Sequence, residues 1–428
     1  MEIFMLIISF IVLVGIRVPI AWSIGIASLV TILFSIDSIA AFTTVSQRVV
    51  TGLDSFSLLA IPFFILAGHI MNSGGIAKRL IEFAKSLVGS LPGGLAHVNI
   101  VAAMMFGAIA GSAGAAAAAI GSFMSERMEK EGYTKEYGVA VNVTAATTGL
   151  LIPPSNIFII YSLASGGVSI GALFLAGYIP GIITGLILMA IALIWARRKG
   201  FPTSKRSSAA QVFKAFIDAL PSLLLLIIII GGIVAGIFTA TEASSVAVVY
   251  CLILAFLYKE MTITNLKAVL VQAAGTISLV MLLIAMSIAM SWVMSYENIP
   301  QEVTSALLSV SENPIVVMIL INLILLFIGI FMDMTPAVLI FTPIFLPVAV
   351  AMGIDPVHFG VIMVLNLCIG LCTPPVGAVL FIGVGVAGTT IQKVVKPLLP
   401  LFVGMLFSLI LVILFPALSL WLPRLFGF

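Results

Sequence analysis

One carboxylate lies deep within an apolar stretch of this 428-residue chain. Asp333 falls inside the hydrophobic run 314–352, beside Thr335 and Pro336. A carboxylate in the interior of a bilayer is costly unless a cation or hydrogen-bond donors compensate its charge. Oxygen ligands of this kind suit a hard cation. The position therefore predicts a cation ligand; the competing interpretation is a turn close enough to the surface for water to solvate Asp333.

A second polar residue lies in the small-residue run GSAGA at 111–115, within the apolar stretch 94–124. Such small residues allow the chain to turn at membrane depth, so this stretch would form a hairpin that returns to its own side. The Ser112 hydroxyl and the nearby glycine carbonyls would then offer neutral oxygen ligands to a second cation. The alternative is that Ser112 only allows close helix packing.

Two Pro-Pro pairs interrupt apolar segments, at 153–154 in TGLLIPPSN and at 374–375 in IGLCTPPVG. Each proline removes a backbone donor and clashes with the preceding turn, so each pair predicts a broken helix or, alternatively, a simple kink. Broken backbone at membrane depth is tolerated where it lines a cavity, and it leaves carbonyls for a cation and helix N-termini for an anion. Asn156 and Thr373 flank the breaks and add polar groups.

These motifs recur in both halves of the chain at one constant offset. Gly149 aligns with Gly370, the first Pro-Pro pair aligns with the second, and GSAGA aligns with MDMTP at 332–336. The repeat predicts that each half contributes one hairpin and one broken helix to a shared site, as in many secondary transporters. No Lys or Arg lies at that site, so helix N-termini and bound cations would have to hold an anionic substrate.

The composition predicts that the bilayer is the solvent for these elements. Hydrophobic residues are 62% of the sequence, charged residues are 8%, and the mean hydropathy is +1.31. Soluble domains carry about 25% charged residues. The length allows roughly ten spanning helices of about 20 residues. The net charge of +3 is spread over loops and indicates no nucleic-acid partner. Three cysteines in apolar runs indicate neither a disulfide framework nor a zinc site.

The positions of Lys and Arg predict the topology. In the predicted scheme the N-terminus lies outside, the segments 3–16, 19–35 and 56–73 span the membrane, and both hairpins are re-entrant. All but two of the 19 basic residues then lie on the cytoplasmic side, the exceptions being Arg48 and Arg424. Both termini lie outside in this scheme. The two hairpins open to opposite sides, so the halves form an inverted repeat.

We therefore predict an all-α polytopic membrane protein made of two inverted repeats. The first, 1–200, contains scaffold helices within 3–73, an amphipathic arm helix at 76–90, the hairpin 92–130, the broken helix 134–166 and a helix at 170–196. A cytoplasmic linker at 201–214 leads to the second, 215–428. The second contains helices within 219–294, an arm helix at 299–311, the hairpin 314–352, the broken helix 356–390 and a helix at 398–422.

Taken together, the GSAG hairpin tip, both Pro-Pro breaks and the tip with Asp333 resemble the large permease (M) subunit of tripartite ATP-independent periplasmic (TRAP) transporters along essentially the whole chain. That family is similar in architecture to the divalent anion–sodium symporters. The resemblance implies a scaffold domain and a mobile transport domain that work as an elevator. It implies sodium-coupled import of an organic acid anion of the C4-dicarboxylate or sialic acid type, and no enzymatic activity.

The resemblance also implies partners and a location. A separate small membrane subunit of four helices and a soluble periplasmic binding protein that delivers the substrate would complete the transporter. The chain would reside in the bacterial inner membrane with its N- and C-termini in the periplasm.

Carried over by position, the resemblance implies two sodium sites around the substrate. The first would be formed by Ser112, Gly149 and Pro153, and the second by Asp333, Thr335, Gly370 and Thr373. The substrate would contact Ser112, Ala113, Asn156, Thr335 and Thr373. The related symporters carry Ser-Asn-Thr at each tip, whereas this chain has Ser-Ala-Gly and Asp-Met-Thr. Its tips therefore offer fewer side-chain contacts to substrate.

Other functions are compatible with parts of the sequence. A self-contained sodium-coupled anion carrier or ion antiporter would share the repeat. A serine hydrolase would pair Ser112 with His69 or His97 as its base, but it would leave the second repeat without a purpose. A passive channel fits the deep Asp333 and the broken helices less well than alternating access does. Both histidines are more typical of packed or interfacial side chains.

Overall fold

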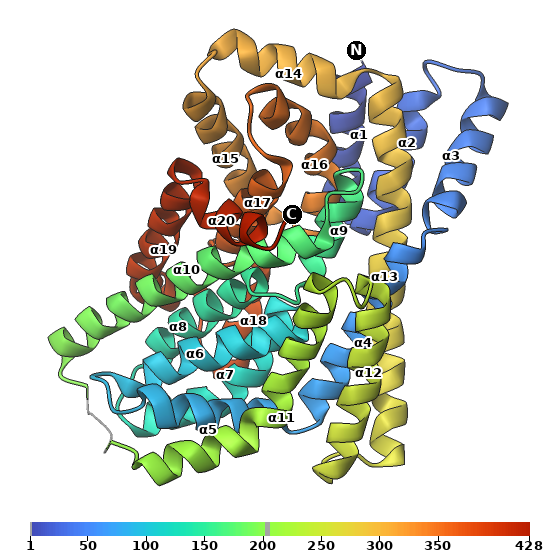
Figure 1. Cartoon of the computed structure of the whole chain (residues 1–428). Helices are drawn as coiled ribbons and strands as arrows, with labels where there is room; N and C mark the ends of the chain where they lie inside the picture. Colours follow the sequence, from blue (N-terminus) through green and yellow to red (C-terminus); the bar gives the residue numbers. More distant parts are fainter. Residues whose placement is uncertain (1, 202–205) are drawn as a thin grey trace.

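The computed structural model of the chain describes residues 2–201 and 206–428, and every regular element in these ranges is a helix (Figure 1). Residues 202–205 of the predicted linker, including its Lys205, lie outside the described residues. Eight helices in the described ranges are long and apolar enough to cross a membrane. They are η1 with α4 (Phe56–Ser73), α10 (Ile170–Lys199), α11 (Ala209–Val234), α12 (Ala240–Leu257), α13 (Ile263–Tyr296), α15 (Pro314–Phe331), α16 (Met334–Ala351) and α19 (Ile391–Leu414). The prediction of an all-α polytopic membrane protein is confirmed.

The N-terminal helices differ from the prediction. α1 (Glu2–Gly15) and α2 (Ile20–Ile32) have 14 and 13 residues. At about 1.5 Å per residue each is roughly 20 Å long, which is short of the roughly 30 Å hydrocarbon core. The predicted spans 3–16 and 19–35 thus correspond to two helices that are each shorter than this core, and their crossing of the membrane stays a prediction. The apolar run at Leu33 and Phe34 forms a turn instead of extending α2.

Helix α3 (Ser38–Gly52) was not predicted at all. Its many Thr, Ser, Gln and Arg residues resemble a polar loop in the sequence. The Asp37 side chain begins it by accepting a hydrogen bond from the Ile39 amide at 3.0 Å. α3 packs along α13, where its position is fixed by tertiary contact.

Each half contains the predicted pair of helices joined at a tip. α6 (Gly94–Ala110) and α7 (Ala113–Lys130) meet at Gly111 and Ser112, while α15 and α16 meet at Met332 and Asp333. The two amphipathic helices that precede these hairpins lie at opposite ends of the molecule in Figure 1, with α5 (Ile76–Val88) at the lower end and α14 (Ile299–Val310) at the upper end.

Each half also contains a helix broken at its Pro-Pro pair. In the first half α8 (Lys135–Thr148) continues as the short η2 (Gly149–Leu151), and α9 (Asn156–Ala164) resumes after the prolines at an angle of 52°. In the second half α17 (Pro356–Leu371) and α18 (Ala378–Ala387) flank the other pair. Both Pro-Pro bonds are cis. Nearly every residue of α8 and α17 is buried, so the core of the protein lies around these two helices.

Two further boundaries differ from the prediction. Residues 209–214 of the predicted linker already belong to α11, because Ser208 and Gln211 form a reciprocal capping box with hydrogen bonds of 3.3 and 2.9 Å. The predicted helix 398–422 is two helices: α19 ends at Leu414, and α20 (Ala417–Leu425) follows Pro416. Proline at 416 lacks the amide that would continue α19.

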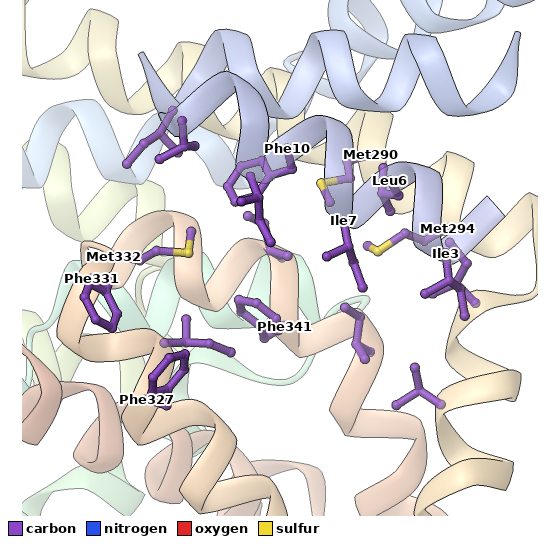
Figure 2. A pocket seen from close by; sticks show the side chains of 18 of the residues that line it. Ile3, Leu6, Ile7, Phe10, Met290, Met294, Phe327, Phe331, Met332 and Phe341 are labelled. Atoms are coloured by element: carbon purple, nitrogen blue, oxygen red, sulfur yellow. The ribbon is translucent and has the colours of Figure 1, made fainter. Parts of the chain in front are cut away.

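A large apolar cleft separates the second hairpin from the N-terminal helices. It has a volume of about 610 Å³ and lies between α1, α13 and α14 on one side and α15 and α16 on the other. Figure 2 shows Phe10 and Ile7 facing Phe341 and Phe327 across it, with Met290 and Met294 of α13 at its border. The second hairpin is thus loosely packed against α1.

Candidate functional site

The two hairpin tips meet at one cavity of about 320 Å³. Its lining residues are Ile61, Ile65, Gly111, Ser112, Ala113, Gly114, Leu150, Asn156, Ile157, Ile160, Thr276, Val280, Asp333, Met334, Thr335, Leu371, Ala378, Val379 and Ile382. Five residues singled out in the sequence therefore lie together: Ser112, Ala113, Asn156, Asp333 and Thr335. Their roles as ligands stay predictions. We call this space the central cavity.

Four helices begin at the central cavity. Ala113 is the first residue of α7, Asn156 of α9, Met334 of α16 and Ala378 of α18, and all four line it. The N-terminus of a helix carries roughly half a positive charge and unpaired amide donors. No Lys or Arg is among the described residues that line it. Backbone dipoles are thus the source of positive partial charge there, beside the negative charge of Asp333.

The first tip is shaped by backbone geometry. Gly111 has a φ of 60°, and a Cβ on it would lie 2.8 Å from Nδ2 of Asn156. Ser112 is the N-cap of α7, and its hydroxyl accepts a hydrogen bond from the Ala115 amide at 3.3 Å. The tip and the first break are therefore in direct contact, and the Ser112 oxygen keeps a lone pair for a further partner.

At the second tip, Asp333 is the N-cap residue of α16 and its side chain is exposed to the central cavity. No ion pair is formed by Asp333 in residues 2–201 and 206–428. Those ranges contain no group of three or more His, Cys, Asp or Glu side chains that could hold a metal ion. A cation here would therefore rely on one carboxylate, hydroxyls and backbone carbonyls, and this donor set suits a hard monovalent ion.

The other predicted ligands lie behind the central cavity instead of lining it. Gly149, Pro153, Gly370 and Thr373 are not among its lining residues. The Thr373 hydroxyl, just past the end of α17, donates to the Ile369 carbonyl of that helix at 2.7 Å. The Gly149 carbonyl accepts from the Ile152 amide at 3.2 Å, and the equivalent Gly370 carbonyl accepts from the Thr373 amide at 2.9 Å. Each of these carbonyls has a second lone pair, and their roles as ligands stay predictions.

Each break is in close contact with the first helix of its own hairpin. A Cβ on Gly149 would lie 2.8 Å from the Ala103 oxygen and 2.9 Å from the Gly107 Cα. A Cβ on Gly370 would lie 2.6 Å from the Gly329 Cα. Glycine is needed at both positions because the backbone of each break touches the backbone of the first hairpin helix and leaves no room for a Cβ. The contact holds each break in place behind its tip.

The two halves meet where their broken helices cross. The Cys368 thiol donates to the Thr147 carbonyl at 3.1 Å, and the Cys372 sulfur lies 3.3 Å from the Thr147 hydroxyl. All three cysteines are free and buried in the structure. Thr147 and Cys368 are equivalent positions in the repeat, because they precede Gly149 and Gly370 by the same number of residues.

Neither histidine considered as a base contacts Ser112. His69 lies 3.3 Å from the Thr276 hydroxyl, and His97 lies 3.2 Å from the Pro92 carbonyl. A serine nucleophile needs a base within hydrogen-bonding reach. The described residues do not supply that pair at Ser112, so the geometry does not support a hydrolase.

The side of the central cavity formed by α4 and α13 was not predicted from the sequence. Ile61 and Ile65 of α4 and Thr276 and Val280 of α13 form it. Three of the four are ordinary apolar residues in ordinary apolar helices, and nothing in the sequence marks them.

A family model described as "Tripartite ATP-independent periplasmic transporter, DctM component" matches residues 7–418.

The chain belongs to this TRAP transporter family. The resemblance seen in the sequence is confirmed, and the chain is a TRAP large permease subunit. A Salmonella typhimurium protein described as uncharacterised, YgiK, is 54% identical over 98% of this chain and 96% of its own length. The C4-dicarboxylate TRAP transporter large permease protein DctM of Vibrio cholerae is 41% identical over 97% of each chain. The sialic acid TRAP transporter large permease protein SiaM of the same species is 40% identical over 89% of each.

A solved structure supports the fold of the TRAP permease. The crystal structure of the Alcanivorax borkumensis YdaH transporter matches with a TM-score of 0.66, and the match covers 90% of each chain at 12% sequence identity. At that identity the likeness concerns the fold alone. The named TRAP relatives are permeases and not enzymes, as predicted for this chain.

Proposed function

We propose that this permease forms the transmembrane path for sodium-coupled import of an organic acid anion of the C4-dicarboxylate or sialic acid type. The observation that carries the proposal is the central cavity, where two hairpin tips and four helix N-termini converge without a basic side chain. The printed names of the relatives, which include permeases for C4-dicarboxylates and for sialic acid, support this substrate class. A small four-helix membrane subunit and a periplasmic binding protein complete the transporter.

Sodium ions act at the two tips in this proposal. Asp333 and Thr335 contribute oxygens at one tip, and Ser112 at the other, with carbonyls from the breaks near Gly149 and Gly370 completing each ligand set. The exposed Asp333 carboxylate and its lack of a protein cation support this assignment. Bound sodium and the helix N-termini together offset the charge of the substrate.

Alternating access follows from an inverted repeat in this proposal. Where two halves are related by a two-fold axis, equivalent residues near the axis meet each other. The contact between Thr147 and Cys368 supports such an axis, as do the arm helices α5 and α14 at opposite ends of the molecule. We place both termini in the periplasm and the chain in the bacterial inner membrane.

The two sides of the central cavity suit a sliding motion of the kind an elevator requires. The hairpin side offers Ser112, Asn156, Asp333 and Thr335, whereas the scaffold side is apolar except for Thr276. Polar contacts therefore remain with the moving part, and few must break at the scaffold. The apolar cleft of about 610 Å³ beside the second hairpin leaves it room to move against α1 (Figure 2).

Reconstitution tests the proposed function. The permease, its small subunit and the loaded binding protein are placed in proteoliposomes, and uptake of radiolabelled succinate and N-acetylneuraminate is measured with and without an inward sodium gradient. We expect uptake of one of them to require both the gradient and the binding protein. Sodium-driven uptake by the permease without the binding protein would support the self-contained carrier instead.

Replacing Ser112 is expected to weaken sodium dependence moderately. Ser112→Ala removes one neutral ligand, worth about 1 kcal/mol, and so raises the half-saturating sodium concentration by roughly fivefold. Backbone carbonyls remain at that tip. Ser122→Ala, in the same hairpin but outside the central cavity, is the matched control. A complete loss of sodium dependence in Ser112→Ala would contradict a site built mainly from backbone oxygens.

A further inference from the structure

A second polar cavity lies between α3 and α13 on one side and α9 and α16 on the other, toward the end of α13 that leads into α14. The place of that end of α13 can be followed in Figure 1. Its volume is about 430 Å³. Its lining residues are Arg48, Gly52, Leu163, Ala164, Gly166, Ser287, Ile288, Ser291, Trp292, Ser295, Leu339 and Pro343. Here α3 and α13 face the end of α9 and the middle of α16. We call this space the outer cavity.

One face of α13 joins the two cavities. Thr276 and Val280 line the central cavity, and Ser287, Ser291 and Ser295 line the outer one. Steps of three or four residues keep side chains on one face of a helix, and Ile284 bridges the gap between the two groups. The same helical face therefore runs from the central cavity into the outer cavity and carries three hydroxyls there.

The Ser287 hydroxyl has no partner among the described residues. Its side chain is 2% exposed, and its oxygen makes no hydrogen bond there. Ser278, on the same helix, shows the usual solution, with its hydroxyl donating to the Ala274 carbonyl at 2.8 Å. A buried hydroxyl without a partner is costly and calls for a water or a ligand. Ser287 is thus free to bind a group that enters the outer cavity.

Arg48 adds a positive charge to the outer cavity. Its guanidinium lies over the Trp292 ring, 5.4 Å from the ring centroid. It forms no ion pair with any acidic residue in the ranges that the structure describes. A planar guanidinium pairs well with a carboxylate through two parallel hydrogen bonds. The described residues that line the central cavity include no such group, whereas the outer cavity has Arg48.

We propose that the outer cavity is an anion-binding vestibule, in which Arg48 and the hydroxyls of Ser287, Ser291 and Ser295 receive the carboxylate of the substrate before it reaches the central cavity. The ligand class rests on the proposed function. The vestibule itself rests on the charge, the unpartnered hydroxyl and the shared face of α13. The shared face of α13 places the two cavities next to each other along one helix, with the buried Ile284 between them.

Thiol labelling tests the vestibule without requiring transport. Ser291→Cys is introduced into the permease complex in lipid nanodiscs, where the three buried native cysteines react little. Its reaction rates with an anionic sulfonatoethyl and a cationic trimethylammonioethyl methanethiosulfonate are then compared. We expect the anionic reagent to be favoured, and Arg48→Gln to lower the ratio of rates by a factor of about three to ten. Arg48→Lys should keep most of the ratio.

Matched controls separate the vestibule from other anion-binding surfaces. Ser309→Cys on α14 is exposed and lies outside the outer cavity, so its ratio of rates should not change with Arg48→Gln. An unchanged ratio at position 291, or an equal change at position 309, overturns the proposal. An effect of Arg48→Gln that appears only when the nanodiscs contain anionic lipid also overturns it, in favour of a site for lipid phosphate.

Uptake kinetics supply the second test. In proteoliposomes containing the complete transporter, Arg48→Gln should lower the maximal uptake rate several-fold while the half-saturating concentration of loaded binding protein stays unchanged. Arg424→Gln, at the other basic residue predicted outside, should change neither value. A raised half-saturating concentration with an unchanged maximal rate overturns the vestibule and identifies Arg48 as a docking residue for the binding protein. If the unmodified complex shows no sodium-driven uptake, the proposed function fails while the labelling result stands.

Discussion

Removing the charge of Asp333 is expected to abolish sodium-dependent uptake by the reconstituted transporter. Asp333→Asn keeps the size of the side chain and its position at the start of α16. It removes the one carboxylate among the described residues that line the central cavity. Asp333 is exposed to a confined cavity, and removing one partner of a charge pair in such a site costs about 3 kcal/mol. This corresponds to a loss of more than about a hundredfold in sodium affinity. Uptake is measured over a range of sodium concentrations.

A second aspartate in the chain provides the matched control. Asp355 is also an N-cap, and its carboxylate accepts a hydrogen bond from the Val357 amide at 2.8 Å, but it lies outside the central cavity. Asn is as good an N-cap as Asp, so Asp355→Asn should keep both the fold and the sodium response. Unaltered sodium dependence in Asp333→Asn would remove Asp333 from the sodium site. An equal loss in both variants would point to a structural role instead.

The functional part of this fold could be predicted because its signals are local. A Pro-Pro pair cannot continue a helix, and an aspartate inside an apolar segment must be compensated. These signals located the tips and the breaks, and the repeat predicted that Ser112, Asn156 and Asp333 share one site. The structure places all three around the central cavity.

The contributions of α3, α4 and α13 could not be predicted in the same way because the positions of these helices are set by tertiary packing. Ile61 and Val280 line the central cavity, yet as apolar residues in apolar helices they look like lipid-facing positions. Helix α3 has a polar sequence and is held by its Asp37 cap and by α13. Sequence periodicity reports which residues avoid water, but it does not report which helix they contact.

The sequence singles out the two glycines at the breaks, but it indicates only part of what they do. Gly149 and Gly370 were carried over as ion ligands. In the structure each also allows its break to touch the first helix of the hairpin. This packing role cannot be seen in a single sequence, because the helix that each glycine contacts lies about 40 residues earlier in the chain.

Adding a methyl group at Gly370 is therefore expected to destabilise the permease and to impair uptake. The Cβ of Gly370→Ala would lie 2.6 Å from both the Cα and the carbonyl carbon of Gly329. The clash is with backbone, so α15 must shift from α17 as a unit. Such overpacking costs about 1 to 3 kcal/mol. We expect a lower melting temperature of the purified protein in detergent, together with reduced uptake, because the shift displaces the second tip from the second break.

Two other glycines make this prediction specific. In Gly329→Ala the new Cβ would lie 3.2 Å from the Gly370 Cα, so the loss of stability should be smaller than in Gly370→Ala. In Gly385→Ala, on α18, the new Cβ would meet nothing within 4 Å. Alanine is the better helix former by about 1 kcal/mol, so this variant should be neutral or more stable. If all three variants melted alike, the close contact between α15 and α17 would not be what requires glycine at 370, and a role of its backbone in ion binding would be the stronger explanation.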